Sequence, residues 1–273
     1  MSQMDMPKIL YGTAWKKEQT ATLVEQAILC GFRGIDTACQ PKHYQEDGVG
    51  EALKALQKKG IPRSEIFLQT KFTPLNGQDP KKIPYNPNAT LSQQVEESFR
   101  CSQKNLGSEF IDSLVLHSPL ADLKQTMEVW STMEKLYESK SVGQIGISNC
   151  YQIKTLKYLF ENSNTKPSVL QNRFYGQTNY DKDLRIFCDE HKITYQSFWT
   201  LSANPHILEN NSFQKIAKEL NRTPAQILFR YVTQIGVVPL TGTCSEKHMK
   251  EGLAIFDFTL EKKHMQTIDS LLV

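Results

Sequence analysis

Short runs of β-branched and aromatic residues alternate with amphipathic segments along almost the whole chain. Between the runs, apolar side chains return every three or four residues, as at Val49, Ala52 and Leu56, which is the period of a helix. Because parallel strands must be joined by crossovers, this alternation predicts an α/β fold with a parallel sheet. Eight runs favour a closed (β/α)8 TIM barrel over an open doubly wound sheet, and they lie at residues 8–13, 34–36, 65–71, 110–117, 144–148, 168–171, 193–198 and 236–240.

The chain length agrees with one barrel. Its 273 residues are close to the roughly 250 that such a barrel occupies, so we expect a single domain over residues 1–273. An open dinucleotide-binding sheet would carry the sequence G-x-G-x-x-G between its first strand and helix. The corresponding residues 11–16 contain one glycine. A bound nucleotide must therefore be held by something other than a glycine-rich turn.

Charge and hydropathy argue against several classes of partner. The formal net charge is only +3 and the lysine pairs are scattered, so we do not expect a nucleic acid partner. Residues 1–11 lack the features of a secretory signal, and no later stretch approaches the roughly 18 unbroken apolar residues of a membrane span. We therefore expect a cytoplasmic protein with no membrane association.

The cysteines show neither metal-ligand spacing nor close pairing, so we expect single thiols and no metal site. Cys39 is open to two interpretations, a buried packing residue or an oxidisable thiol near a functional site. The six cysteines are Cys30, Cys39, Cys101, Cys150, Cys188 and Cys244.

Three polar residues fall at the carboxyl ends of predicted strands, namely Asp36, Lys71 and His117, and Tyr44 follows shortly after the second strand. Barrel enzymes keep their catalytic groups at that end of the strands, so these four side chains are expected to converge at one mouth. Taken alone, each has a structural alternative, such as a helix cap, a loop anchor or a packing residue.

The chemistry of such a cluster is specific. A lysine beside an aspartate stays charged, and an ammonium about 4 Å from a phenol would favour phenolate by about 4 kcal/mol at an effective dielectric near 20. Lys71 would thereby make Tyr44 a proton donor near neutral pH. The imidazole of His117 would hydrogen-bond a carbonyl oxygen and orient it. A hydride is the one reactant that these side chains do not supply.

Several motifs resemble the aldo-keto reductase superfamily in their order and spacing. The resemblance runs from about Tyr11 to Leu253, nearly the entire chain. The motifs are GIDTA at residues 34–38, Tyr44 followed by VGEAL at residues 49–53, Lys71, LHSP at residues 116–119 and GQIGISN at residues 143–149.

This resemblance implies an NADPH-dependent reductase of aldehydes or ketones, with the cofactor extended across the barrel mouth. Asp36, Tyr44, Lys71 and His117 match the family's catalytic tetrad. Ser148, Asn149 and Gln171 match the side chains that hydrogen-bond the nicotinamide carboxamide. Phe198 matches a ring that stacks on the nicotinamide, with core filling as its alternative, and Leu201 is expected at the cofactor site as well.

The loop after the eighth strand departs from the family. The usual basic residue, serine and later arginine that bind the adenosine 2′-phosphate are replaced by residues 239–248. A loop that leads into a helix start still suits a phosphate. The expected contacts are Thr241, Gly242, Thr243, Lys247 and His248. Without an arginine fork, NADH remains possible as the cofactor.

The loop before Tyr44 departs as well. Seven residues separate Asp36 from Tyr44, where the family usually has four, so this loop must bulge if the phenol is to reach the site. His43 is the rival candidate for the proton donor.

Two irregular stretches are expected around the pocket. Residues 72–89 contain four prolines and are predicted to form a wall or lid, and residues 201–211 are predicted to join the same rim. The expected substrate walls are Trp15, Phe72 and Trp199, with rim packing as the alternative for Trp15. The short segment 260–272 predicts an open pocket.

Two functions remain open from the sequence. The first is an enzyme that reduces a small-molecule carbonyl substrate with NADPH, acting as a monomer. The second is a non-catalytic NADPH-binding regulatory or interaction protein on the same barrel. A complete tetrad favours the enzyme, because a protein that only binds the nucleotide has no need of a tuned phenol.

Overall fold

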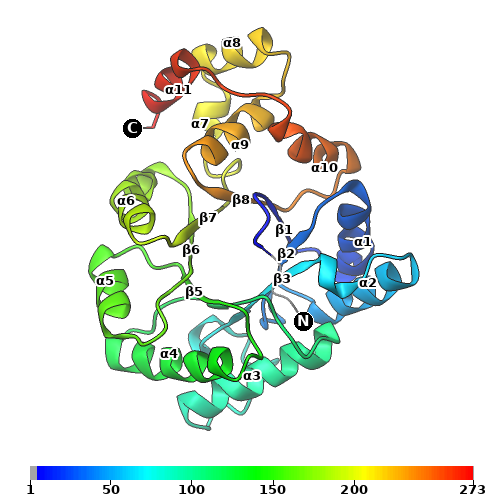
Figure 1. Cartoon of the computed structure of the whole chain (residues 1–273), viewed down its shortest axis with the longest axis vertical. Coiled ribbons are helices and arrows are strands. Elements are labelled where there is room, and N and C mark those ends of the chain that lie inside the picture. The colour runs from blue at the N-terminus through cyan, green and yellow to red at the C-terminus, as the bar shows by residue number, and fades with distance from the viewer. Residues whose placement is uncertain (1–4, 273) are drawn as a thin grey trace.

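Eight parallel strands form a closed barrel in the order β1 to β8 (Figure 1). The structure, a computed structural model, describes residues 5–272. It confirms the predicted (β/α)8 barrel, and each strand lies within a few residues of its expected place. The strands are β1 (Leu10–Gly12), β2 (Gly34–Asp36), β3 (Phe67–Phe72), β4 (Ser113–Leu116), β5 (Ile145–Ser148), β6 (Val169–Arg173), β7 (Thr194–Phe198) and β8 (Val238–Thr241).

Helices surround the barrel on its outer side (Figure 1). Their apolar faces pack on the strands, and this layer between helices and sheet holds much of the hydrophobic core. The helices are α1 (Thr20–Cys30), α2 (Glu46–Lys58), α3 (Leu91–Leu106), α4 (Leu123–Glu138), α5 (Ile153–Asn162), α6 (Lys182–Glu190), α7 (Pro205–Leu208), α8 (Asn211–Glu219), α9 (Pro224–Gln234), α10 (Glu246–Leu253) and α11 (Lys262–Asp269).

Local sequence signals set several helix starts. Thr90 caps α3 because its hydroxyl accepts from the backbone N–H of Gln93. The side-chain oxygen of Gln93 accepts in turn from the backbone N–H of Thr90. Thr223 and Gln226 form the same capping box at α9. Each box satisfies two donors that a helix leaves unpaired at its first turn. These caps fix where the chain leaves the loops at the barrel mouth and enters the outer helices.

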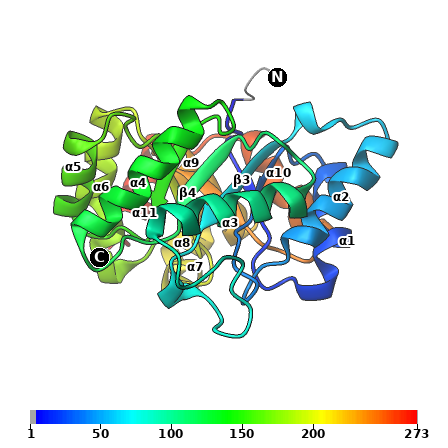
Figure 2. The same ribbon diagram turned by 90° about the horizontal axis from the view of Figure 1, so that it is seen from below.

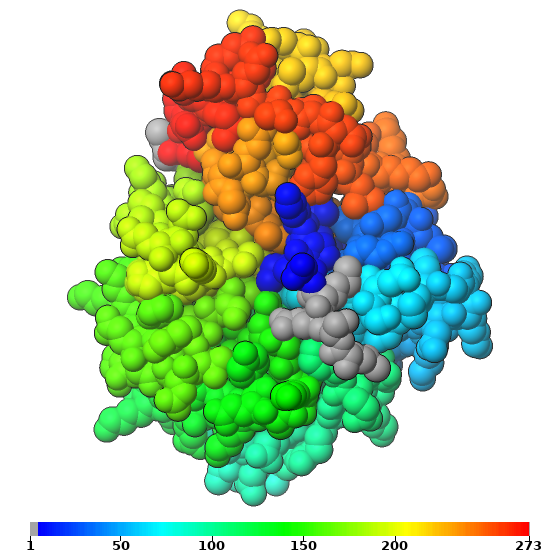
Figure 3. All heavy atoms as spheres, viewed as in Figure 1, coloured from blue at the N-terminus to red at the C-terminus, as the bar shows by residue number. Residues whose placement is uncertain are grey.

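The amino-terminal segment lies over one end of the barrel. In Figure 3 the dark blue residues that precede β1 cover the barrel centre on the face shown. There the Sδ atom of Met6 accepts from Nε2 of Gln196 in β7 at 3.2 Å. Figure 2 shows α7, α8 and the loop between β3 and α3 on the opposite side. The carboxyl ends of the strands therefore form the end at which a site can open.

The stretch after β7 is more regular than expected. Residues 205–208 form α7, and α8 begins at Asn211.

Within the described chain, residues 5–272, no helix combines the length and apolar character needed to cross a bilayer.

The contact between α2 and α3 depends on a glycine. A Cβ placed on Gly50 would lie 2.0 Å from the backbone oxygen of Asn105, whereas one on Gly252 in α10 would meet its nearest neighbour, Ile9, at 3.8 Å. We expect Gly50→Ala to lower the free energy of unfolding by about 1–3 kcal/mol despite the higher helix propensity of alanine. The control Gly252→Ala should leave stability unchanged or raise it by up to about 1 kcal/mol. Urea denaturation measures both, and equal stability of the two variants would contradict the packing.

Candidate active site

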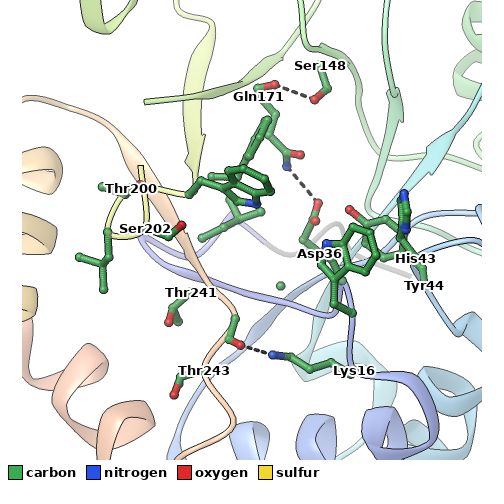
Figure 4. A pocket seen from close by; sticks show the side chains of 18 of the residues that line it. Lys16, Asp36, His43, Tyr44, Ser148, Gln171, Thr200, Ser202, Thr241 and Thr243 are labelled. Atoms are coloured by element: carbon green, nitrogen blue, oxygen red, sulfur yellow. Dashed lines mark hydrogen bonds between the residues drawn. The ribbon is translucent and has the colours of Figure 1, made fainter. Parts of the chain in front are cut away.

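The strand ends bring four predicted residues to one mouth. Asp36 ends β2, Lys71 is the penultimate residue of β3, and His117 directly follows β4. A cavity of about 570 Å³ opens above them. Asp36 and Tyr44 line it (Figure 4), and so does His117. Lys71 lies beneath the cavity wall and is 1% exposed. The expected convergence of these four side chains is therefore present.

Asp36 and Lys71 form a buried ion pair. Lys71 Nζ lies 2.6 Å from Asp36 Oδ2, and it also donates to the backbone oxygen of Thr37 at 2.9 Å. Burial lowers the pKa of Lys71, while the Asp36 carboxylate raises it. Two of the three ammonium hydrogens are thus donated to acceptors at the end of β2. Lys71 Nζ also lies 5.2 Å from the centre of the Tyr44 ring.

The long loop after β2 turns back toward the mouth. The backbone N–H groups of His43 and Tyr44 both donate to the oxygen of Gln40, at 3.1 and 3.0 Å. This tight turn absorbs the additional residues and brings the Tyr44 ring to 6.0 Å from the His117 ring in an edge-on arrangement. The bulge predicted for this loop is present, and the Tyr44 side chain reaches the cavity.

The expectation that Lys71 lowers the pKa of Tyr44 toward neutral is wrong. Burial raises the pKa of the Tyr44 phenol well above its ordinary range, and the Asp36 carboxylate raises it further. Burial disfavours the charged phenolate, and this effect is the larger of the two. Tyr44 is therefore a protonated phenol at neutral pH, with a proton available for transfer.

His117 is held as a neutral imidazole. Its Nδ1 is 2.6 Å from the hydroxyl of Thr73. Burial lowers the pKa of His117 to about 3, and the positive charge of Lys71 contributes to the shift. Since Nδ1 is engaged by Thr73, Nε2 is the nitrogen left for a ligand in the cavity.

The residues expected around a nicotinamide line the same cavity. Ser148 donates its hydroxyl to the backbone oxygen of Gln171 at 2.7 Å, and Asn149 Nδ2 donates to the backbone oxygen of His117 at 2.9 Å. Phe198 faces the cavity at the end of β7 and is not fully buried, which favours the stacking interpretation over core filling. Leu201 is also part of the lining.

Two tryptophans form the rim, and one expected wall is absent. Trp15 and Trp199 line the cavity and are 58% and 50% exposed. Phe72 is 1% exposed and packs on Tyr85, so its prediction as a substrate wall is wrong. Strand side chains alternate between faces, and because Lys71 points into the barrel, its neighbour Phe72 points outward.

The loop at residues 72–89 is also not a wall of the cavity, whose lining includes none of its residues. Tyr85 is buried and its hydroxyl donates to the backbone oxygen of Thr73 at 2.8 Å. Gln40 Nε2 donates to the backbone oxygen of Gly77 at 2.7 Å. The loop therefore supports the turn before Tyr44 from outside, and the lid prediction is wrong.

The loop after β8 extends the cavity. Thr241, Gly242 and Thr243 line the main cavity, as expected. Lys247 and His248 lie in an adjoining cavity of about 290 Å³. The two cavities adjoin each other between the tetrad and the start of α10, and together they are called the trough below. They share the lining residues Leu201, Phe229, Thr241 and Thr243.

Lys16 was missed by the sequence analysis. Its ammonium hydrogen-bonds the backbone oxygen of Gly242 and lies 3.5 Å from the Cys244 sulfur, so it joins the loops after β1 and β8 across the cavity (Figure 4). The side chain is 7% exposed. Its position in the loop after β1, next to Trp15, was the one signal in the sequence.

Cys39 is 3% exposed and is not part of the cavity lining. A hydrogen bond with Cys101, together with burial, raises the pKa of the Cys39 thiol. The packing interpretation therefore fits better than that of an exposed oxidisable thiol. Across residues 5–272, no three His, Cys, Asp or Glu side chains cluster as metal ligands would.

The barrel with a trough across its carboxyl end has close relatives. A family model described as "Aldo/keto reductase family" matches residues 8–203 and 177–273. The chain is 31% identical to a 9,11-endoperoxide prostaglandin H2 reductase of Trypanosoma cruzi, over 97% of this chain and 88% of the relative. It is 30% identical to the glyoxal reductase of Bacillus subtilis, over 91% and 82%.

A solved structure agrees with these matches. MGS-M4, an aldo-keto reductase from a Medee basin deep-sea metagenome library, is 29% identical and superposes with a TM-score of 0.83 over 98% of this chain and 92% of its own. The fold is therefore the single closed (β/α)8 barrel that this structure shares. The chain belongs to the aldo-keto reductase family.

The ion pair predicts a specific pattern of stability. Asp36→Asn leaves the Lys71 ammonium buried without a carboxylate, so we expect the free energy of unfolding to fall by about 3–5 kcal/mol. Lys71→Met in the same chain removes the stranded charge and should restore more than half of that loss. Urea denaturation at pH 7 measures Asp36→Asn, Lys71→Met alone and the double variant. If the double variant is as unstable as the sum of the single ones, the pair is not the coupled unit described above.

Proposed function

We propose that this protein reduces aldehydes or ketones to alcohols with NADPH. The observation that carries the proposal is the joint placement of a protonated Tyr44 and a neutral His117 in one cavity, directly above the buried Asp36–Lys71 pair. The family uses NADP(H), and one relative is named for the reduction of glyoxal, an aldehyde.

The trough suits an extended dinucleotide. Amide and hydroxyl groups lie at the tetrad end, where Ser148, Asn149 and Gln171 would bind a carboxamide and Phe198 would stack on the attached ring. Cationic side chains lie farther along: Lys16 would face the phosphates, with Lys247 at the far end. This sequence of apolar, amide and cationic groups supports NADPH, and NADH would use the same trough.

The chain's own residues account for the proton and the orientation of the substrate. When bound, the reduced nicotinamide supplies the hydride. His117 Nε2 would hold the carbonyl oxygen by a hydrogen bond, and Tyr44 Oη would deliver a proton to the same oxygen as negative charge develops. The Lys71 ammonium, fixed by Asp36, would stabilise the phenolate that remains on Tyr44.

Substitution of Tyr44 tests this role. Tyr44→Phe removes the transferable proton while keeping the ring, so we expect kcat with 4-nitrobenzaldehyde to fall by about 10²–10⁴-fold and the NADPH Kd to change less than about threefold. Loss of reduced-nicotinamide absorbance measures turnover, and fluorescence titration measures binding. The exposed Tyr158 in α5 gives a matched control, and Tyr158→Phe should behave as wild type.

Two outcomes would redirect the proposal. If Tyr44→Phe keeps its rate and His43→Phe loses it, His43 is the proton donor. The centroids of the His43 and Trp15 rings lie 3.7 Å apart with their planes tilted by 38°, and phenylalanine would preserve that ring contact. If the wild-type protein binds NADPH but reduces none of a panel of aldehydes and ketones, the non-catalytic alternative is favoured.

The pKa shifts predict the pH profile. Burial lowers the pKa of Lys71 from its ordinary value of 10.5, whereas the pKa of Tyr44 is raised, so Lys71 loses its proton first as pH rises. We expect kcat to fall on the alkaline side as Lys71 becomes neutral. Because the pKa of His117 is lowered to about 3, its protonation should cause no decline between pH 5 and 8. A fall in kcat as the pH is lowered, with a midpoint between pH 6 and 7, would contradict a neutral His117.

A further inference from the structure

A layer of glutamines fills the barrel just beneath the mouth. Gln69 in β3, Gln171 in β6 and Gln196 in β7 are at most 3% exposed. Barrel interiors are usually packed with branched aliphatic side chains, and a buried amide is costly unless its hydrogen bonds are made. We therefore expect these amides to make hydrogen bonds that an aliphatic packing residue could not make.

The three amides converge on the Asp36 carboxylate. Gln69 Nε2 donates to Asp36 Oδ1 at 2.7 Å and to Gln196 Oε1 at 2.8 Å. Gln171 Nε2 donates to Asp36 Oδ1 at 3.0 Å and to Gln196 Oε1 at 2.7 Å. Gln196 Nε2 returns a bond to Gln69 Oε1 at 3.1 Å. Asp36 thus has two amide donors on Oδ1, while Oδ2 receives the Lys71 ammonium.

The charge on Asp36 sets the direction of every hydrogen bond among the three glutamines. An ionised carboxylate can only accept hydrogen bonds, so Gln69 and Gln171 must both turn their NH2 groups toward it. Gln196 must then present its oxygen to those two amides. Gln171 is left with its own amide oxygen for the cavity that it lines (Figure 4). Reversing any one amide would place two acceptors or two donors against each other among buried side chains.

The layer continues to the closed end of the barrel. Ser113 donates its hydroxyl to Gln69 Oε1 at 2.8 Å, and Gln144 Nε2 donates to Ser113 at 3.3 Å. Gln196 Nε2 also contacts the Met6 sulfur. The amides are thus braced from below as well as from the carboxylate above, which limits their freedom to rotate.

We propose that Gln69 and Gln196 are positioning residues of the reaction. They hold the Asp36 carboxylate and the Gln171 amide in one fixed arrangement. Asp36 can then direct the Lys71 ammonium toward Tyr44, while Gln171 offers an oxygen to the NH2 group of a bound carboxamide. One hydrogen-bonded layer thereby fixes the position of the proton donor, Tyr44, relative to the place where a nicotinamide ring would bind. The proposal rests on the proposed carbonyl reduction.

The effect on Lys71 must pass through Asp36. The charged or titratable groups around Lys71 are Asp36 from β2, Tyr44 from the following loop, Glu46 from α2 and His117 from β4. Of these, the glutamine layer bonds only Asp36. Without the amide donors on Oδ1, the Asp36 carboxylate is no longer held in place against the ammonium and can turn away from it. Burial then acts on Lys71 without a fixed carboxylate beside it, so Lys71 should lose its proton at lower pH.

The test compares Gln69→Met, Gln196→Met and a control, Gln144→Met. Methionine fills a similar space without donating hydrogen bonds, and Gln144 belongs to the same layer without touching Asp36. Wild-type turnover with NADPH is measured first, on a panel of aldehydes and ketones that includes 4-nitrobenzaldehyde. If none is reduced, the proposed function is refuted and the layer is judged by NADPH affinity alone. For the Gln69 and Gln196 variants we expect a roughly tenfold lower kcat and an alkaline limb shifted down by about one pH unit. Gln144→Met should keep the wild-type limb.

Thermal unfolding and NADPH titration accompany each profile. If Gln69→Met does not fold, Ser113→Ala, which removes one bond to Gln69, should give a smaller shift in the same direction. An alkaline limb at the wild-type pH in both Gln69→Met and Gln196→Met would overturn the proposal, even if both lose stability, because a purely structural layer would lower the amount of folded protein without moving the limb. In a protein without turnover, unchanged NADPH affinity in both variants would overturn it as well.

Discussion

A lysine and an aspartate that are both almost fully excluded from water meet at the mouth of this barrel. A charge buried in this way is tolerated only where its partner and further hydrogen bonds compensate for the lost hydration. Lys71 has the Asp36 carboxylate and the Thr37 carbonyl, and Asp36 has two further amide donors. The position of each charge therefore constrains the strands, loops and interior residues around it.

This requirement explains features on both sides of the pair. Below it, the barrel interior is polar where such barrels are usually apolar, because the carboxylate needs donors. Above it, the loop after β2 makes a tight turn at Gln40 that brings Tyr44 over the ammonium, and residues 72–89 brace that turn from outside. The cavity then adds a neutral imidazole at His117. The arrangement holds one transferable proton, on Tyr44, beside one fixed positive charge.

The sequence predicted the parts that follow from strand order. Asp36, Lys71 and His117 end neighbouring parallel strands, so their convergence follows once the eight units are recognised. The pKa of Tyr44 was not predictable, since it depends on burial that only the folded loop defines. The orientations of Phe72 and Gln69 were open to prediction from the alternation of side chains along β3. Phe72 follows Lys71 and must face away from the barrel interior, whereas Gln69 lies two residues before Lys71 and must face the interior as Lys71 does. Lys16 needed the spatial approach of two distant loops.

A crystal structure with NADP⁺ bound tests the central claim most directly. The account predicts the nicotinamide ring on Phe198, its carboxamide NH2 on the amide oxygen of Gln171, and the Tyr44 hydroxyl facing the reactive carbon with the Asp36–Lys71 pair intact beneath it. A nicotinamide bound elsewhere in the trough, or a Tyr44 hydroxyl turned away from both Lys71 and the ring, would contradict it.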